Sequence, residues 1–239
     1  MTQQEKDQIL EKFKFWFKTS LIESHKKNTE KLRNIDEFQI NPFLLYYLAS
    51  YLEGNANPKS LAKALVYPRV LGTSITTSFG TGMQRFVSQI LGAYGSTTSG
   101  IDIEFIDQVD KRKKYCQLKS GPNAINKDDI TTIDNHFKAV KNLARTNNLQ
   151  LQYGDLVFAL TYGEENELNA FVGALQQKNI SVYVGKEFWY RFTGDIDFYK
   201  HLIIACGEVA KEIDMKDVID DVILDLSKTV EAHFKKLFN

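Results

Sequence analysis

The feature that most constrains the fold is a change of hydrophobic period at Ile101. Before it, apolar residues recur every three or four positions, as Ile9 and Phe13 do within residues 4–32. From Ile101 to Phe105, apolar and acidic residues alternate. A period near 3.6 is typical of amphipathic helices, and a period of two is typical of half-buried strands. The chain therefore has to combine a helical N-terminal part with a sheet.

Two residue pairs predict further helices in the N-terminal part. Asn41-Pro42 and Asn57-Pro58 are helix-opening pairs, because proline suits the first turn of a helix. We expect the second of these helices to run toward Tyr67, where Pro68 interrupts it. The small, polar stretch 72–82 is then expected to be a flexible loop that leads into another helix.

The alternation at Ile101 opens a predicted hairpin. Residues 110–114 are interpreted as a solvated charged turn, and residues 115–119 as the returning strand. Asn126 has the character of an N-cap for a helix that reaches about Arg145. The later elements are expected as a strand at 155–161, a helix at 165–177, a strand at 180–184, and helices at 197–210 and 215–238.

This order of elements predicts an α/β fold with a central mixed β-sheet flanked by helices. The segment from residue 157 to 180 is a βαβ unit, so its two strands should be parallel. We divide the single domain, residues 1–239, into a helical N-terminal part (1–71), a catalytic α/β core (72–185) and C-terminal helices (186–239).

Composition and local hydrophobicity exclude several classes of protein. Lys plus Arg and Asp plus Glu number 30 each, which argues against nucleic-acid binding through a general basic excess but leaves local basic surfaces open. Cys116 and Cys206 lie in apolar segments, so we expect buried reduced thiols rather than a disulfide or a zinc site. The polar start of the chain is no signal peptide, and the apolar run 43–52 is shorter than the about 20 residues that span a bilayer. We therefore expect a soluble, cytoplasmic protein.

Two pairs of side chains on the hairpin point to chemistry. Asp102 and Glu104 are two apart on one strand and so share a face, as do Gln117 and Lys119 on the next strand. The hairpin would place the two pairs beside each other, opposite an apolar face. The side-chain oxygens of Asp102, Glu104 and Gln117, together with the backbone carbonyl of Leu118, are suitable ligands for Mg²⁺. A lysine beside the cation can balance the charge that develops on a phosphate under attack.

The residues from Gly100 to Phe105, followed by 115–123, resemble the PD-(D/E)xK nuclease superfamily. The order Asp-Ile-Glu-Phe, then Gln-Leu-Lys-Ser-Gly-Pro-Asn, is similar to certain type II restriction endonucleases. The resemblance covers about residues 72–126. Two positions depart from the commoner pattern: Ile101 stands where proline is usual, and Gln117 gives a QxK form of the motif.

The resemblance implies a restriction-endonuclease-like core that hydrolyses double-stranded DNA at a short, palindromic site and leaves a 5′-phosphate. It implies catalytic roles for Asp102, Gln117 and Lys119. It also implies Mg²⁺ ligands from Asp102, Glu104, Gln117 and the Leu118 carbonyl, with Mn²⁺ as a possible substitute. A homodimer is expected because a two-fold protein matches a two-fold DNA site. A cognate DNA methyltransferase is expected in the same system.

Several flanking residues are candidates for DNA contact, namely Thr81, Gln84, Ser120, Asn123 and Asn126. The histidines are scattered along the chain, and we interpret them as surface or packing residues. Two alternatives stay open at this point. One is a repair or junction-resolving nuclease of the same superfamily, and the other is a catalytically inactive module that only binds DNA.

Overall fold

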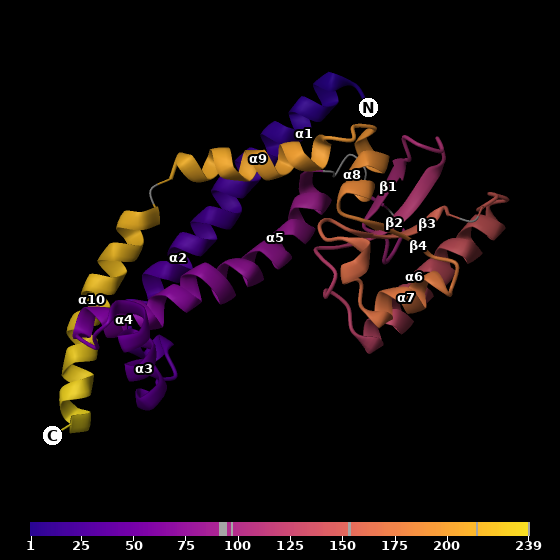
Figure 1. Ribbon diagram of the computed structural model, residues 1–239. Coiled ribbons are helices and arrows are strands. Elements are labelled where there is room, and N and C mark those ends of the chain that lie inside the picture. Colours follow the sequence, from indigo (N-terminus) through magenta and orange to yellow (C-terminus); the bar gives the residue numbers. More distant parts are fainter. Residues whose placement is uncertain (91–94, 97, 153, 214, 239) are drawn as a thin grey trace. The chain divides into compact units, whose positions relative to one another are not determined.

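The computed structural model describes residues 1–90, 95–96, 98–152, 154–213 and 215–238 (Figure 1). The chain divides into two compact units. Unit 1 comprises Met1–Trp16 and Gly80–Gly207, and unit 2 comprises Phe17–Phe79 and Glu208–Asn239. This grouping differs from the three consecutive parts expected from the sequence, because each unit is assembled from segments far apart in the chain.

Unit 1 is built on a four-stranded mixed sheet in the order β1-β2-β3-β4. The strands span Ile103–Ile106, Lys113–Lys119, Leu156–Leu160 and Ser181–Val184. β1 and β2 are antiparallel, with Ile103 opposite Cys116, as the predicted hairpin requires. β2 pairs with β3 in parallel, and β3 with β4 in parallel. These pairings confirm the predicted mixed α/β fold and its parallel βαβ pair.

Helices cover both faces of this sheet (Figure 1). α6 (Lys127–Thr146) and α7 (Ala170–Gln176) contribute apolar side chains to one core with β3. On the other face, Phe188 and Phe192 of α8 (Lys186–Thr193) pack on Phe105 of β1. The expectation of one apolar and one charged face is therefore corrected. The face under α6 and α7 is mostly apolar, because these helices need an apolar surface to pack on, and its polar residues lie toward the two ends of β2.

The stretch 72–82 is helical, and the prediction of a loop there is wrong. α4 (Pro58–Pro68) continues through a π-helical segment (Arg69–Ser74) into α5 (Ile75–Ile90). Pro68 has a helical φ of −62°, so the helix continues through the proline instead of ending there.

The glycines of this stretch serve packing rather than a turn. A Cβ atom on Gly82 would lie 2.9 Å from the ring of Trp16, so the glycine allows close approach of the two segments. Trp16 belongs to α1 (Gln3–Trp16), and its ring centroid lies 5.0 Å from that of Phe86 on α5. A distant tertiary contact thus decides the structure of residues that look flexible locally.

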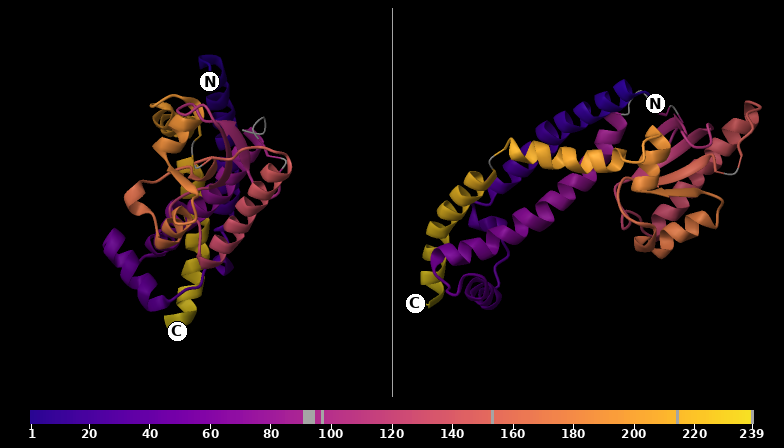
Figure 2. Two further views of the ribbon diagram at one scale, coloured as in Figure 1. Left: turned by 90° about the vertical axis from the view of Figure 1, so that its right-hand side faces the viewer. Right: turned by 45° about the horizontal axis from the view of Figure 1, so that its top comes forward.

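Unit 2 is a helical assembly. α2 (Glu23–Lys31), α3 (Pro42–Glu53), α4 and α10 (Met215–Phe238) belong to it, and Figure 2 shows them in two further views. Apolar residues of α3, α4 and α10 meet in one core, which includes Leu45, Leu61, Val222 and Leu226.

The predicted helix starts in unit 2 are confirmed. The side chain of Asn41 accepts a hydrogen bond from the Leu44 amide, and that of Asn57 accepts one from the Ser60 amide. Gly54 ends α3 with φ +72°, a conformation that favours glycine. The long helix expected at 4–32 consists of α1, a π-helical segment (Phe17–Ile22) and α2.

Other predictions had mixed outcomes. The helix expected at 165–177 is shorter, because Asn169 caps α7 by accepting from the amides of Phe171 and Val172. α8 was not predicted, whereas α9 (Phe198–Lys211) and α10 were. Both cysteines are free; Cys116 is buried and Cys206 is half-buried. Within the described residues, no helix has the length and apolar character to cross a membrane.

Candidate active site

The residues expected to carry the chemistry meet at one end of the β1–β2 hairpin. Asp102 lies just before β1, and its carboxylate accepts a hydrogen bond of 2.6 Å from the Leu118 amide. The Asp102 amide donates to the Cys116 carbonyl at 3.0 Å. The two bonds tie Asp102 to β2 on both sides of Gln117, so they place a carboxylate beside the glutamine.

Gln117 and Lys119 alternate with Leu118 along β2 and therefore share one face of the sheet. Gln117 is 9% exposed, and its Nε2 lies 3.3 Å from Nδ1 of His136. Its Oε1 is buried and has no hydrogen-bond partner among the described residues. Lys119 is half-buried and makes no hydrogen bond or ion pair with any described residue. The Gln117 oxygen and the Lys119 ammonium, on the same face of β2, therefore have no hydrogen-bond or ion-pair partner among the described residues.

The surroundings of Asp102 raise its pKa above the ordinary value. The largest cause is the loss of water around the carboxyl, which disfavours the charged form although the residue as a whole is exposed. The hydrogen bond from Leu118 and the nearby charge of Lys119 lower the pKa but do not offset this. A cation beside the carboxyl would favour its charged form.

Glu104, the other acidic candidate, is already paired. Its carboxylate lies 2.6 Å from Lys113 Nζ and accepts a hydrogen bond of 2.6 Å from Ser96 Oγ. Desolvation favours the neutral acid, but the bonds from Lys113 and Ser96 outweigh it and lower the pKa of Glu104. The structure therefore places Glu104 in an ion pair, whereas the Gln117 oxygen has no partner among the described residues.

The candidates for DNA contact have different surroundings. Thr81 and Gln84 belong to α5, but their side chains lie outside the described part of the structure. Ser120 Oγ lies 3.6 Å from the position that a Cβ on Gly80 would take. Asn123 is exposed. None of these positions tests contact with DNA, which stays a prediction.

Asn126 has a structural role that the sequence predicted. Its side-chain oxygen accepts from the amides of Asp128 and Asp129, and the Asp129 carboxylate accepts from the Asn126 amide. This capping box begins α6, the helix that covers the candidate site. The prediction of DNA contact by Asn126 is untested.

Sequence reasoning missed His136. The residue follows Ile133 by three positions and precedes Val140 by four, so it lies on the buried stripe of α6. A Cβ on Gly100, which has φ +81°, would lie only 2.2 Å from Cγ of His136. Gln117 and His136 are 19 positions apart, and no local motif joins them. A polar residue on an otherwise apolar stripe was the one available signal.

The other end of the hairpin corrects the expectation of a solvated turn at 111–114. Lys114 is fully buried, with Nζ 2.5 Å from an Asp110 oxygen and 3.5 Å from an Asp155 oxygen. Arg112 forms two hydrogen bonds with Asp155, one of them 2.8 Å long. Lys114 is buried because the carboxylates around it supply the opposite charge that a buried ammonium needs.

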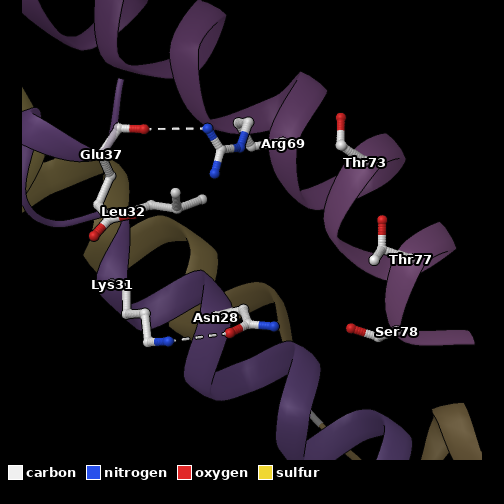
Figure 3. Close-up of a pocket in the computed structure, with 8 residues that line it drawn as sticks. All are labelled: Asn28, Lys31, Leu32, Glu37, Arg69, Thr73, Thr77 and Ser78. Carbon is white, nitrogen blue, oxygen red and sulfur yellow. Dashed lines mark hydrogen bonds between the residues drawn. The ribbon is translucent and has the colours of Figure 1, made fainter. Parts of the chain in front are cut away.

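Unit 2 contains a pocket of about 290 Å³ (Figure 3). Figure 3 shows Asn28 and Lys31 on one helix and Thr77 and Ser78 on another. Arg69, also in its lining, donates to the Glu37 carbonyl at 3.1 Å. The pocket offers hydroxyl groups, basic side chains and Glu37, but none of its lining residues has a buried side-chain oxygen without a hydrogen-bond partner among the described residues.

The oxygen atoms of the hairpin site fit a hard cation. Among the described residues there is no group of three or more His, Cys, Asp or Glu side chains that could share a metal ion. The site offers instead one carboxylate, from Asp102, and the orphaned oxygen of Gln117. The Leu118 carbonyl points to the same strand edge as its amide, which faces Asp102. Carboxylate, amide and carbonyl oxygens are ligands that Mg²⁺ and Ca²⁺ accept.

Comparison with known proteins gives one finding and one absence. Residues 11–214 match the family model described as type II restriction endonuclease EcoO109I. The matched range includes the hairpin, α6 and every residue of the candidate site. No curated protein matches the chain.

Proposed function

The chain belongs to the family of type II restriction endonuclease EcoO109I, and from this premise we propose that it hydrolyses double-stranded DNA at a short, palindromic sequence, uses Mg²⁺ and leaves a 5′-phosphate. The bond between the Asp102 carboxylate and the Leu118 amide is the observation that supports this most. It sets a carboxylate beside Gln117 and near Lys119, and phosphodiester hydrolysis needs a cation site next to a positive side chain.

Each residue of the site has a separate part in this proposal. Asp102, Gln117 through Oε1 and Leu118 through its carbonyl would hold Mg²⁺, with Mn²⁺ as a substitute. When bound, the cation polarises the scissile phosphate and lowers the pKa of water. Lys119 makes no ion pair with any described residue, so its ammonium is available to balance charge on the phosphate. Glu104 would have to leave Lys113 before it could serve as a further ligand.

Incubation with DNA tests this function against the open alternatives. We expect discrete fragments when the purified protein is incubated with linear plasmid DNA and Mg²⁺, and none with EDTA. Ligation of the fragments without prior phosphorylation would report a 5′-phosphate. Cleavage of branched DNA alone would favour a junction-resolving nuclease. Binding without cleavage, together with no binding of Mn²⁺, would favour the inactive module.

A restriction enzyme acts with a modification enzyme, and this supplies a second check. We expect a cognate DNA methyltransferase in the same system, acting in the cytoplasm on the same sequence. Plasmid that carries this methylation should resist cleavage, whereas unmethylated plasmid of the same sequence should be cut. Equal cleavage of the two plasmids would contradict a restriction-modification role.

We also propose that the enzyme is a homodimer, and the exposed face of α3 supports this. Phe43, Tyr47 and Tyr51 are 88%, 60% and 79% exposed. The other exposed apolar residues of α3 are Leu44, Tyr46, Leu48 and Leu52. At 3.6 residues per turn these seven positions spread over about 240° around α3, so one interface takes only part of them. Phe43, Tyr47 and Tyr51 follow one another at four-residue spacing and form the stripe that a second copy would cover.

The charge of α3 favours a second copy as the occupant of this face. Its one charged residue, Glu53, is paired with Lys63 at 2.6 Å. An uncharged apolar face offers nothing to DNA phosphates, but it complements an identical face across a two-fold axis.

Sedimentation of two charge variants tests the dimer. Tyr51→Glu should turn a dimer into a monomer and reduce cleavage of both strands at least tenfold, because a two-fold site needs two active sites. Leu71→Glu is the matched control, since Leu71 is 72% exposed in unit 2 but lies outside α3. A wild-type monomer, or a dimer that persists in Tyr51→Glu, would contradict the assignment.

A further inference from the structure

The orientation of the Gln117 amide decides whether the site can accept a cation. Rotation of the amide by 180° exchanges its oxygen and its nitrogen. One orientation offers Oε1, an acceptor with two lone pairs, and the other offers an NH₂ group that can only donate. A cation binds the first and is repelled by the second. Since a carboxylate at this position would need no such selection, the glutamine makes a selecting contact necessary.

His136 provides that contact. Its Nδ1 lies 3.3 Å from Nε2 of Gln117. Because the amide nitrogen only donates, Nδ1 has to accept, and the neutral imidazole carries its proton on Nε2. With Nε2 bound in this way, Oε1 is turned to a buried position where no described residue bonds to it. The arrangement leaves unpaired the atom of Gln117 that a cation would use.

The imidazole lies on the buried side of α6 and close to the backbone of Gly100. Ile133 and Val140, one turn away in each direction along α6, are buried in the core of unit 1. On the other side, the backbone of Gly100 lies so close that a Cβ there would come within 2.2 Å of Cγ of His136. Gly100 also begins the segment that carries Asp102. His136 therefore contacts both the glutamine and the approach to the aspartate.

We propose that His136 is a positioning residue that holds the Gln117 amide with its oxygen toward the cation site, an inference that rests on the proposed function. It acts through Gln117 and touches neither the DNA nor the cation. Residues that orient metal ligands in this way are worth about 10- to 100-fold in metal affinity.

Binding of Mn²⁺ without DNA, measured by calorimetry or electron paramagnetic resonance, tests the role apart from cleavage. His136→Leu keeps an apolar side chain of similar size but removes the acceptor, and we expect about a tenfold or larger loss of Mn²⁺ affinity. His136→Asn returns an acceptor close to the Nδ1 position and should restore the affinity to within about threefold. The control is Asn142→Ala, an exposed position on the same helix, which should bind Mn²⁺ as the wild type does.

A coupling measurement separates positioning from packing. In a Gln117→Leu background, the further change His136→Leu should cost no additional affinity, because the amide that it orients is gone. If His136→Leu does not fold, His136→Ala takes its place in both backgrounds.

Each outcome decides the inference. Wild-type affinity in His136→Leu overturns it, and so does an affinity in His136→Asn as low as that in His136→Leu. A wild-type protein that binds no Mn²⁺ also overturns it. If the wild type binds Mn²⁺ through Gln117 and His136 but cuts no DNA, the positioning role stands and the proposed function fails.

Discussion

The two ends of the β1–β2 hairpin carry similar residues, but within the described part of the chain those at the turn are paired and those at the open end are not. At the turn, Lys114 is fully buried and lies within ion-pair distance of Asp110 and Asp155. At the open end, Lys119 has no ion pair with any described residue, and the Gln117 oxygen has no partner. Buried polar groups that are all satisfied hold a fold together, whereas an unsatisfied one points to an absent ligand. Within one hairpin, the state of the partners separates a structural lysine from a candidate catalytic one.

The largest effect should come from Asp102→Asn, which tests the open end. Asparagine keeps the shape and can still accept from the Leu118 amide, but it lacks the charge that holds a cation. We expect the single-turnover cleavage rate to fall at least 1,000-fold, or about 4 kcal/mol in the barrier, with an unchanged melting temperature. A variant that retains a tenth of the wild-type rate would remove Asp102 from the proposed ligands.

Lys119→Ala should slow cleavage several hundredfold, about 3.5 kcal/mol in the barrier. The ammonium stabilises charge that develops in the transition state, so DNA affinity should change far less than the rate. Lys119→Arg should not restore the rate, because a planar guanidinium cannot take the place of a compact ammonium. Loss of affinity with full rescue by arginine would instead indicate a simple phosphate contact.

Lys114→Met should have the opposite effect, a loss of stability with little change in the cleavage rate. Removal of the ammonium leaves Asp110 and Asp155 with one counter-ion fewer beside a buried position, so we expect the free energy of unfolding to fall by about 3 kcal/mol. Cleavage below the melting temperature should stay close to that of the wild type. Urea unfolding followed by circular dichroism gives the first quantity. If stability were unchanged and cleavage lost, the two ends of the hairpin would not be separable.

Low pH should reduce the stability that the turn end of the hairpin contributes to the fold. Burial favours neutral Asp155, but the hydrogen bonds from Arg112 and from the Gln152 amide outweigh it and lower the pKa of Asp155. A carboxylate with a lowered pKa stabilises the fold above its unfolded pKa, and this stability is lost as the pH falls through the folded value. Urea unfolding at about pH 6 and about pH 3 should show this loss, and Asp155→Asn should reduce the difference between the two. An equal difference in the variant would exclude Asp155 as its source.

Glu104→Gln should have the smallest effect. The Glu104 carboxylate is paired with Lys113, whose side chain is 52% exposed, and exposed pairs contribute little to stability. We expect cleavage to change less than about tenfold, or 1.4 kcal/mol in the barrier. A loss equal to that of Asp102→Asn would add Glu104 to the ligands and would extend the open end along β1.

Local signals made the helix starts and the hairpin predictable. Asn41, Asn57 and Asn126 cap helices as their neighbours in sequence indicate. Asp102 and Gln117 were also predictable as neighbours, because a short hairpin joins them. These inferences depend on residues within about one turn or one hairpin of each other, a range at which pattern and propensity decide the structure.

What sequence reasoning missed depends on distant contacts. Gly82 looks like part of a loop in the sequence, but in the structure it lies in a helix and packs against the ring of Trp16. Lys114 looks solvated in the sequence, but in the structure Asp155, the residue before β3, lies 3.5 Å from its ammonium. His136 joins the site only when α6 folds over β2. In each case a tertiary partner overrides the local preference, and no pattern in a single segment reports it.

Gly100 has a consequence for how this protein can change over generations. A side chain at position 100 would collide with His136 at 2.2 Å, and the backbone there has φ +81°. The order of substitutions is therefore constrained: a larger residue at 100 becomes tolerable only after a smaller one has replaced His136, and the backbone still disfavours it. Descendants of this sequence should lose the histidine before they lose the glycine.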